Sequence, residues 1–384
     1  MKSLRSLAVM ASSVLLLAAC GGGAAPASTA PSSNPAPASA AKPAASTAAP
    51  ASAGASASAK PAASAGASAA AKPAASGAAA AGEGKPLMLS YSAIIGNNLP
   101  EWVADAAGIF KQNGLNVQLT YIESSKGIPA LLAGETWAMN LGGSETLAAV
   151  AQGADLVTVT DNAPVYSFIL QVAPEIKSAA DLKGKKLGVS QFGSASDIAL
   201  RVALRKLNLD PDKDVSILAV GSASTRLAAM ESGAIQGGMS FPPESLTLEA
   251  KGFHTLVDLA ALKAPSNIGT TSFTRKYLEA NRPIVQKYVD SVVEGIARAR
   301  KDKAFTIDVL KKYHKSDDQK AMEATYDFFV NEVIPQYPHP LPDQYADSVA
   351  ILSAKDPKVK DVDLSKMLDD SFMKDAEARG VGKA

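Results

Sequence analysis

The feature that most constrains the fold is a regular alternation of strand-like and helix-like segments, which begins at about residue 85. Short apolar runs such as Val117–Tyr121 and Lys186–Val189 are followed by amphipathic stretches such as Ser194–Leu207. Such alternation is typical of βαβ units and predicts an α/β fold with mostly parallel sheets. After about Thr274 the chain becomes mostly helical, and Pro283–Arg300 carries apolar residues at spacing four, which suits one buried helix face.

Two extended stretches, Asp161–Val172 and Pro265–Phe273, flank the middle third of this region. If both run between lobes, the middle third is an inserted lobe joined by two strands, and the C-terminal helices return to the first lobe. We therefore predict lobe 1 at residues 85–163, lobe 2 at residues 164–267, and the return to lobe 1 with the C-terminal helices at residues 268–384.

The only cysteine, Cys20, ends the tetrapeptide Leu17-Ala18-Ala19-Cys20. It follows a basic start and an apolar run, an arrangement that is typical of a secretory signal peptide and too short to span a bilayer. A cysteine after small residues at the cleavage point indicates a bacterial lipoprotein signal. We predict that residues 1–19 are a signal peptide, cleaved before a lipidated Cys20. The alternative is an ordinary signal peptide with a chance cysteine.

Residues 20–84 consist almost entirely of Ala, Ser, Pro and Gly, with a Lys-Pro-Ala-Ala-Ser motif at Lys42, Lys60 and Lys72. This composition cannot bury enough side chain to offset the entropy lost on ordering. It predicts a disordered tether between the lipid and the globular part. The recurring prolines disfavour an alanine-rich helix.

Charge and residue pattern exclude several function classes. The 38 Lys and Arg balance the 37 Asp and Glu, and no basic stripe indicates nucleic acid. The three histidines, His254, His314 and His339, lack the spacing of metal ligands, and the sequence has neither a nucleophile elbow nor a phosphate loop. We therefore expect no catalytic residue, no metal and no cofactor.

Small polar residues gather at four predicted strand-to-helix junctions. Such a junction exposes free backbone N–H groups and the positive end of a helix, so several of them facing one crevice would bind an anion or a polar ligand. The alternative is that these residues only cap helices. Trp102, Trp137, Phe192 and Phe241 could stack on a flat ligand or could belong to the core. The junctions are Ser124–Gly127, Gly142–Ser144, Gly193–Ser196 and Gly221–Thr225.

Several stretches of the folded part occur in an order that is known from one protein family. They are Ala106–Phe110 with Asn113–Val117, Ala130–Glu135, Gly142–Ala148 with Gly153–Asp155, Ile176–Val189 and Leu227–Gly233. In this order they resemble the solute-binding lipoproteins of ABC importers of the nitrate, sulfonate, taurine and thiamine-pyrimidine type. The resemblance covers residues 87–260 well and the helical remainder loosely.

The chain departs from this family where relatives often carry aspartate, at Thr136-Trp137, Gln236-Gly237 and Phe241-Pro242-Pro243. These changes prevent a transfer of any one relative's ligand specificity. The sequence shows no obvious arginine clamp for a carboxylate or sulfonate. Lys126 is the only basic residue within a junction, and Arg226 lies just beyond another.

The resemblance implies a periplasmic-binding-protein type II fold, in which two lobes with mostly parallel sheets are joined by two crossover strands. It implies a substrate-binding protein of an ABC importer that is not an enzyme. We expect a monomer, anchored by its N-terminal lipid on the outer face of the cytoplasmic membrane or in the periplasm, with an ABC permease as its partner. The alternatives are a ligand-sensing lipoprotein for a signalling partner and a pyrimidine-precursor enzyme on the same fold.

The expected ligand is a small organic anion or a polar heteroaromatic of the sulfonate, nitrate or taurine-like class, held in the interlobe cleft. By resemblance, one wall contains the loop Ser92–Asn98 and two junctions, and the other wall contains two further junctions. Phe241 would make the pocket more aromatic. The expected substrate-binding residues are Ser92, Asn97, Ser125, Gly143, Ser144, Gly193, Ser194, Thr225 and Phe241.

Overall fold

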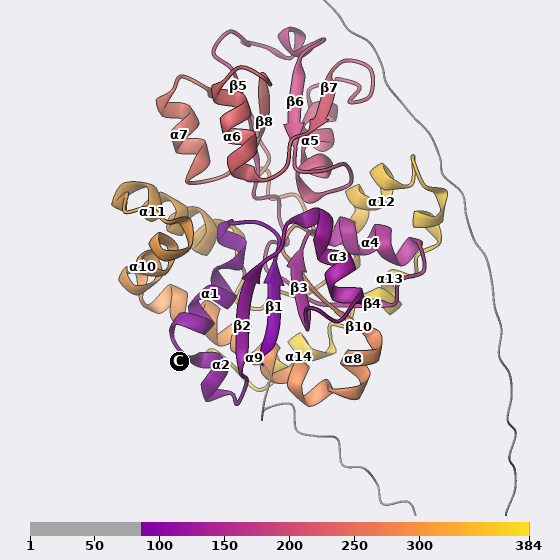
Figure 1. Cartoon of the computed structure of the whole chain (residues 1–384), viewed down its shortest axis with the longest axis vertical. Helices are drawn as coiled ribbons and strands as arrows, with labels where there is room; N and C mark the ends of the chain where they lie inside the picture. The colour runs from indigo at the N-terminus through magenta and orange to yellow at the C-terminus, as the bar shows by residue number, and fades with distance from the viewer. Residues whose placement is uncertain (1–85, 384) are drawn as a thin grey trace, which may run out of the picture. The chain divides into compact units, whose positions relative to one another are not determined.

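The computed structural model describes residues 86–383 and contains two five-stranded sheets (Figure 1). The predicted signal peptide, the lipidated Cys20 and the predicted tether lie outside the described residues. We call the first sheet and its helices lobe 1, and the second sheet and its helices lobe 2.

The strands of lobe 1 follow the order β2-β1-β3-β10-β4. Strand β1 pairs in parallel with β2 and β3, whereas β10 runs antiparallel between β3 and β4. Four strands therefore point in one direction and one is reversed. The bounds are β1 Leu87–Tyr91, β2 Val117–Tyr121, β3 Ala138–Leu141, β4 Leu156–Asp161 and β10 Thr270–Thr274.

Lobe 2 repeats this arrangement in the order β7-β6-β8-β5-β9. Strand β6 pairs in parallel with β7 and β8, and β5 runs antiparallel between β8 and β9. The predicted α/β architecture with mostly parallel strands is confirmed. The bounds are β5 Ile169–Val172, β6 Lys186–Val189, β7 Ser216–Ala219, β8 Gly237–Ser240 and β9 His254–Asp258.

Strand β8 was not predicted, although it lies at the centre of its sheet. Its sequence, Gly-Gly-Met-Ser, lacks the β-branched residues that signal a strand. The glycines permit close packing, because a Cβ built on Gly237 would lie 2.8 Å from the carbonyl oxygen of Gln171 in β5. The segment pattern therefore missed this strand, because its small residues fit close packing against β5 rather than the usual composition of a strand.

Two segments connect the lobes, one from β4 to β5 and the other from β9 to β10. They lie side by side, since Val165 and Pro265 form an antiparallel bridge. Next to it, the backbone N–H of Ser266 donates a hydrogen bond of 2.8 Å to the carbonyl oxygen of Pro164. The two extended stretches of the sequence thus form the paired crossover, whereas the exact limits of the lobes stay a prediction.

Fourteen α-helices are present among residues 86–383. Those that precede or follow strands are α1 Leu99–Ala106, α2 Ile109–Gln112, α3 Ser124–Leu132, α4 Gly143–Ala151, α5 Ala195–Lys206, α6 Ala223–Glu231 and α7 Glu244–Ala250. The C-terminal helices are α8 Arg275–Ala280, α9 Arg282–Lys301, α10 Lys303–His314, α11 Gln319–Tyr326, α12 Ala346–Leu352, α13 Leu364–Met367 and α14 Ser371–Ala378. The structure also contains a π-helix, η3 Asp327–Val333, and the short 3-10 helices η1 Gly96–Asn98, η2 Ala179–Leu182, η4 Pro342–Tyr345 and η5 Pro357–Asp361.

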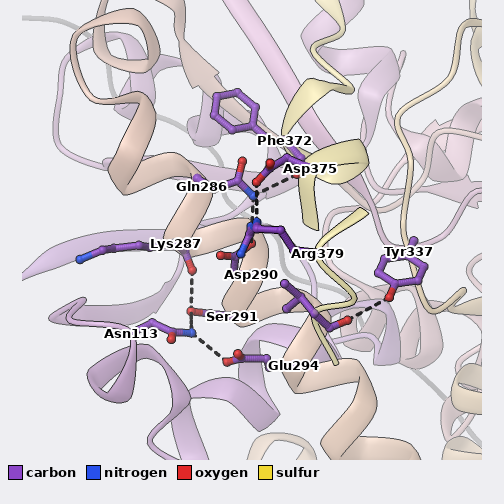
Figure 2. A network of polar contacts seen from close by, with 11 residues as sticks. Asn113, Gln286, Lys287, Asp290, Ser291, Glu294, Tyr337, Phe372, Asp375 and Arg379 are labelled. Carbon is purple, nitrogen blue, oxygen red and sulfur yellow. Dashed lines mark hydrogen bonds and ion pairs between the residues drawn. The ribbon is translucent and has the colours of Figure 1, made fainter. Parts of the chain in front are cut away.

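Helix α9 ties the C-terminal helices to lobe 1. Its buried face includes Tyr288, Val292 and Ile296, as the spacing of four predicts, and it packs against α1 and α14. Polar contacts reinforce this packing in Figure 2. Arg379, directly after α14, forms an ion pair with Asp290 of α9, and Asn113 after α2 donates a hydrogen bond of 2.8 Å to Glu294 (Oε2) of α9.

The contact between α9 and α1 is close enough to test by substitution. A Cβ added at Gly295 would lie 2.3 Å from the carbonyl oxygen of Pro100, which is backbone and cannot turn away. We expect Gly295→Ala to lower the free energy of unfolding by about 1–3 kcal/mol, because overpacking outweighs the better helix propensity of alanine. Urea unfolding followed by circular dichroism measures this.

The control is Lys301→Ala, an exposed substitution on the same helix, which should change the free energy of unfolding by less than about 0.5 kcal/mol. A Gly295→Ala protein as stable as the parent would show that α9 is not packed against α1 at this distance.

Candidate functional site

A cavity of about 280 Å³ is lined by residues of both lobes. Ser92, Leu141 and Gly142 stand at the ends of β1 and β3 in lobe 1, and Ser190 and Phe241 directly follow β6 and β8 in lobe 2. All of them lie at the carboxyl ends of parallel strands. In α/β folds this is the edge at which ligands bind.

Four helices begin at this cavity, two from each lobe. Ser124 starts α3 and Gly142 precedes α4, while Ser194 and Ser222 precede α5 and α6. The N-terminus of a helix carries free backbone N–H groups and a partial positive charge. The cavity is therefore suited to an anionic or strongly polar group. The four junctions that the sequence singled out meet here.

Five of the nine expected binding residues line the cavity: Ser92, Asn97, Ser125, Ser194 and Phe241. They come from the loop after β1, from the start of α3, from the loop before α5 and from the end of β8. Their contact with a ligand stays a prediction.

The other four expected residues, Gly143, Ser144, Gly193 and Thr225, are not part of the lining. A Cβ on Gly143 would lie 2.5 Å from the hydroxyl of Tyr345, so this glycine faces the protein interior. Ser144 is fully buried, and Gly193 packs near Leu352.

Thr225 is part of a helix cap, as in the alternative that the junction residues only cap helices. Its backbone N–H donates a hydrogen bond of 3.2 Å to Ser222 (Oγ), and the two hydroxyls lie 2.9 Å apart. The cavity takes Ser222 and Ser224 from this junction instead. The contact of Thr225 with a ligand stays a prediction.

Of the aromatic residues considered for stacking, Phe241 alone lines the cavity, next to Phe168 at a ring distance of 5.7 Å. Trp102 belongs to the core, stacked on Tyr313 at 4.3 Å. Trp137 is also in the core, and Phe192 is 58% exposed outside the lining.

The sequence did not single out Glu145, which lines the cavity from the first turn of α4. Glu145 is 9% exposed, and burial raises the pKa of its carboxyl to about 7. Its Oε1 accepts hydrogen bonds from Ser124 (Oγ) and from Gln191 (Nε2), the latter at 3.2 Å. Because Gln191 belongs to lobe 2, this carboxyl is held from both lobes.

Among the described residues, Arg226 is the only basic one in the lining, whereas Lys126 is exposed outside it. Its Nε donates to the carbonyl oxygen of Met239 at 2.7 Å, and its Nη1 donates to Ser190 (Oγ) at 3.3 Å. Burial lowers the pKa of Arg226 to about 10, so the guanidinium stays charged at neutral pH. The sequence underrated this residue, because it lies one position beyond a junction.

Asp161 joins the two crossover segments. Its Oδ1 accepts hydrogen bonds from the backbone N–H of Ala163 at 3.1 Å and from that of Gly269 at 3.3 Å. Ala163 belongs to the first crossover and Gly269 to the second. Asp161 is fully buried, and burial raises the pKa of its carboxyl to about 8.

Two mixed sheets, a paired crossover and a cavity at the strand ends define a two-lobed protein of the periplasmic-binding-protein type II fold. The chain belongs to the NMT1/THI5-like family, whose model matches residues 96–304. No match was found among curated proteins. Both the predicted family type and the predicted fold class are confirmed.

Solved structures share this fold at low sequence identity. A protein of Bordetella bronchiseptica RB50 is 22% identical with a TM-score of 0.66, over 77% of this chain and 98% of that one. The periplasmic aliphatic sulphonate binding protein SsuA of Escherichia coli is 21% identical with a TM-score of 0.58, over 74% and 92% of the two chains.

An enzyme also has this fold. A mutant of the desulfurization enzyme DszB, in complex with biphenyl-2-sulfinic acid, is 16% identical with a TM-score of 0.55, over 76% of this chain and 99% of that one. The fold alone therefore does not separate a binding protein from an enzyme.

Two further observations concern only the described residues. No helix within residues 86–383 combines the length and the apolar character needed to cross a membrane. Within the same residues, no three His, Cys, Asp or Glu side chains form a group that could hold a metal ion.

The buried carboxyl of Asp161 predicts a pH dependence of stability. The unfolded chain releases this proton near pH 4, whereas the folded protein keeps it until about pH 8, so the free energy of unfolding falls as pH rises between these values. Asp161→Asn removes the titration and keeps an oxygen for both N–H groups. We expect the slope between pH 5 and pH 7 to become less steep by up to about 1.4 kcal/mol per pH unit.

Urea unfolding at several pH values measures this slope. Asp317→Asn, an exposed substitution, is the control and should leave it unchanged. An Asp161→Asn protein with the slope of the parent would mean that Asp161 is ionised in the folded state.

Proposed function

We propose that the chain is the substrate-binding protein of an ABC importer, capturing a small organic anion or a polar heteroaromatic of the sulfonate, nitrate or taurine-like class. The observation that carries this proposal is the convergence of four helix N-termini and Arg226, from two lobes, on one cavity. The confirmed family and the fold shared with SsuA support it.

Capture follows from the two-lobe geometry. A ligand that touches both walls favours the closed arrangement of the lobes by its differential affinity for that arrangement. The paired crossover gives the lobes a short common connection about which such a change can occur. A permease that recognises the closed form would then distinguish loaded from empty protein.

The composition of the cavity gives less support to an enzyme. Glu145 could carry a proton, but the described residues that line the cavity include no histidine, cysteine or lysine to act with it as a nucleophile or a second proton carrier. Asn97, Ser92 and the serines of the helix starts provide hydrogen bonds for recognition. We therefore favour binding over catalysis. No observation favours the sensory alternative over import.

We further propose that Cys20 carries a lipid that holds the protein, as a monomer, on the outer face of the cytoplasmic membrane or in the periplasm. The support is the motif Leu17-Ala18-Ala19-Cys20 after a basic and apolar start. Residues 20–84 would then act as the tether between the lipid and the lobes.

Arg226 provides the test of anion capture. The full chain is titrated by calorimetry with toluene-4-sulfonate, methanesulfonate, nitrate and 4-aminopyrimidine, and we expect at least one of them to bind. Loss of a charge-assisted hydrogen bond costs about 1.5–3 kcal/mol, so Arg226→Met should weaken a bound anion by roughly 10- to 150-fold. Lys126→Met, outside the cavity, should leave the affinity within about twofold.

An anion that binds Arg226→Met as tightly as it binds the parent protein would show that the site lies elsewhere. Where no compound binds, a melting temperature that stays constant at millimolar concentrations of each would contradict capture of this ligand class.

Cys20→Ala tests the anchor. In a bacterial host, we expect the parent protein to sediment with membranes and to incorporate a radioactive fatty acid, and the variant to do neither, because its thiol is the site of acylation. Ser12→Ala, inside the predicted signal, is the matched control and should behave as the parent does. Labelling of the Cys20→Ala protein would refute the lipoprotein proposal.

A further inference from the structure

Glu145 is a buried carboxyl for which the described residues offer no cation. It lines the cavity, it is 9% exposed, and it forms no ion pair within residues 86–383. Both of its side-chain hydrogen bonds, from Ser124 and Gln191, come from neutral groups and end on Oε1. A buried carboxylate without a cationic partner is unfavourable, so a cation that enters the cavity would find a strong site.

The second oxygen of Glu145, Oε2, lies beside Gly142. A Cβ built on Gly142 would be 2.6 Å from Oε2, so only glycine at this position leaves room for the carboxyl. The backbone N–H of Gly142 also lowers the pKa of this carboxyl, although burial raises it more strongly. Gly142 and Glu145 both line the cavity, which gives a ligand access to this end of α4.

Neighbouring charges do not neutralise Glu145. Arg226 lines the same cavity, but its Nε and Nη1 donate to Met239 and Ser190. The other charged or titratable groups on the cavity wall and on elements packed against α4 are Tyr121, Glu123, Lys126 on α3, Asp161 on β4, Asp197, Arg201, Arg205 and Lys206 on α5, Tyr345 on η4, Asp347 on α12, and Lys358, Lys360 and Asp361 on η5. None of them forms an ion pair with Glu145 in the described residues.

We propose, on the basis of the capture function above, that Glu145 is a specificity-determining residue that binds a protonated basic nitrogen of the ligand. The ligand then carries two kinds of group, an anionic group at Arg226 and an N–H cation at Glu145. Ser190 and Gln191 of lobe 2 are adjacent in the chain and contact Arg226 and Glu145 respectively, so the two charged groups, one from each lobe, lie near the same two residues. A compact ligand can reach both.

The apolar part of the cavity sets the remaining feature of this ligand class. Phe168, Phe241 and Ile268 line it, together with Ile94 and Ile95. A hydrophobic or aromatic body between the two charged groups would be buried against these side chains. The inferred class is therefore an amine-bearing organic anion with an apolar body, rather than a simple anion.

The test uses pairs of compounds that differ only in the amine. The full chain is titrated by calorimetry with 4-(aminomethyl)benzenesulfonate and toluene-4-sulfonate, with 4-(aminomethyl)benzoate and 4-methylbenzoate, and with benzylamine. At pH 8 we expect the amine-bearing member of a pair to bind at least tenfold more tightly. The amines stay protonated from pH 5.5 to pH 8, whereas the carboxyl of Glu145 takes up its proton near pH 7. The preference should therefore shrink as pH falls.

The variant Glu145→Gln keeps the size of the side chain and removes the charge. We expect it to reduce the preference to less than twofold at every pH, while toluene-4-sulfonate binds within threefold of its affinity for the parent. Glu135→Gln removes an exposed carboxyl of the same lobe outside the cavity, and should retain the parent's preference. Equal melting temperatures of the two variants and the parent establish that all are folded.

Equal affinities within each pair, or a preference that Glu145→Gln retains, would overturn this inference and leave anion capture intact, since toluene-4-sulfonate would still bind. Benzylamine binding that Glu145→Gln abolishes would support the role of Glu145 even where both sulfonates fail to bind, and that failure would count against anion capture alone.

Discussion

The rest of the structure depends on the pairing of the two crossover segments. Val165 and Pro265 form an antiparallel bridge between the segments. The carboxyl of Asp161 also connects them, because it accepts hydrogen bonds from the backbone N–H groups of Ala163 and Gly269. Each segment connects a strand of one sheet to a strand of the other. The pairing of the segments therefore determines which strand ends of the two sheets face each other. The cavity exists because both sheets present their carboxyl ends to this same region.

Facing strand ends have an electrostatic consequence. Four βα units, two in each lobe, contribute a helix whose partially positive N-terminus lies at the cavity. These helix ends attract an anionic group of a ligand between the lobes. Such partial charges are modest when exposed to water and stronger where water is excluded. A ligand that brings the lobes together thus strengthens the field that holds it, which couples recognition to closure.

Local rules predicted strands with short apolar sequences, and β2 and β6 have the predicted bounds. They failed at β8, whose glycines are explained only by the neighbouring strand. The junctions were found because small polar residues mark strand ends, but the lining also needs Glu145 and Arg226, which lie inside helices. Phe168 comes from a crossover, and nothing in its local sequence indicates that it faces the cavity. Trp102 and Trp137 could stack on a ligand as far as the sequence shows. In the structure both belong to the core, where Trp102 contacts Tyr313 and Trp137 contacts Phe273.

The two buried ionisable side chains of the cavity, Arg226 and Glu145, differ in how they are held. Arg226 is anchored inside lobe 2 by Met239 and Ser190, and remains charged whether or not a ligand is present. Glu145 is instead held by Ser124 of its own lobe and Gln191 of the other, so its contacts depend on how the lobes meet. Its pKa near 7 means that small changes in surroundings alter its charge. A cationic group on the ligand would stabilise the ionised form of Glu145. Because this carboxyl accepts hydrogen bonds from both lobes, its ionisation would affect the contact between them.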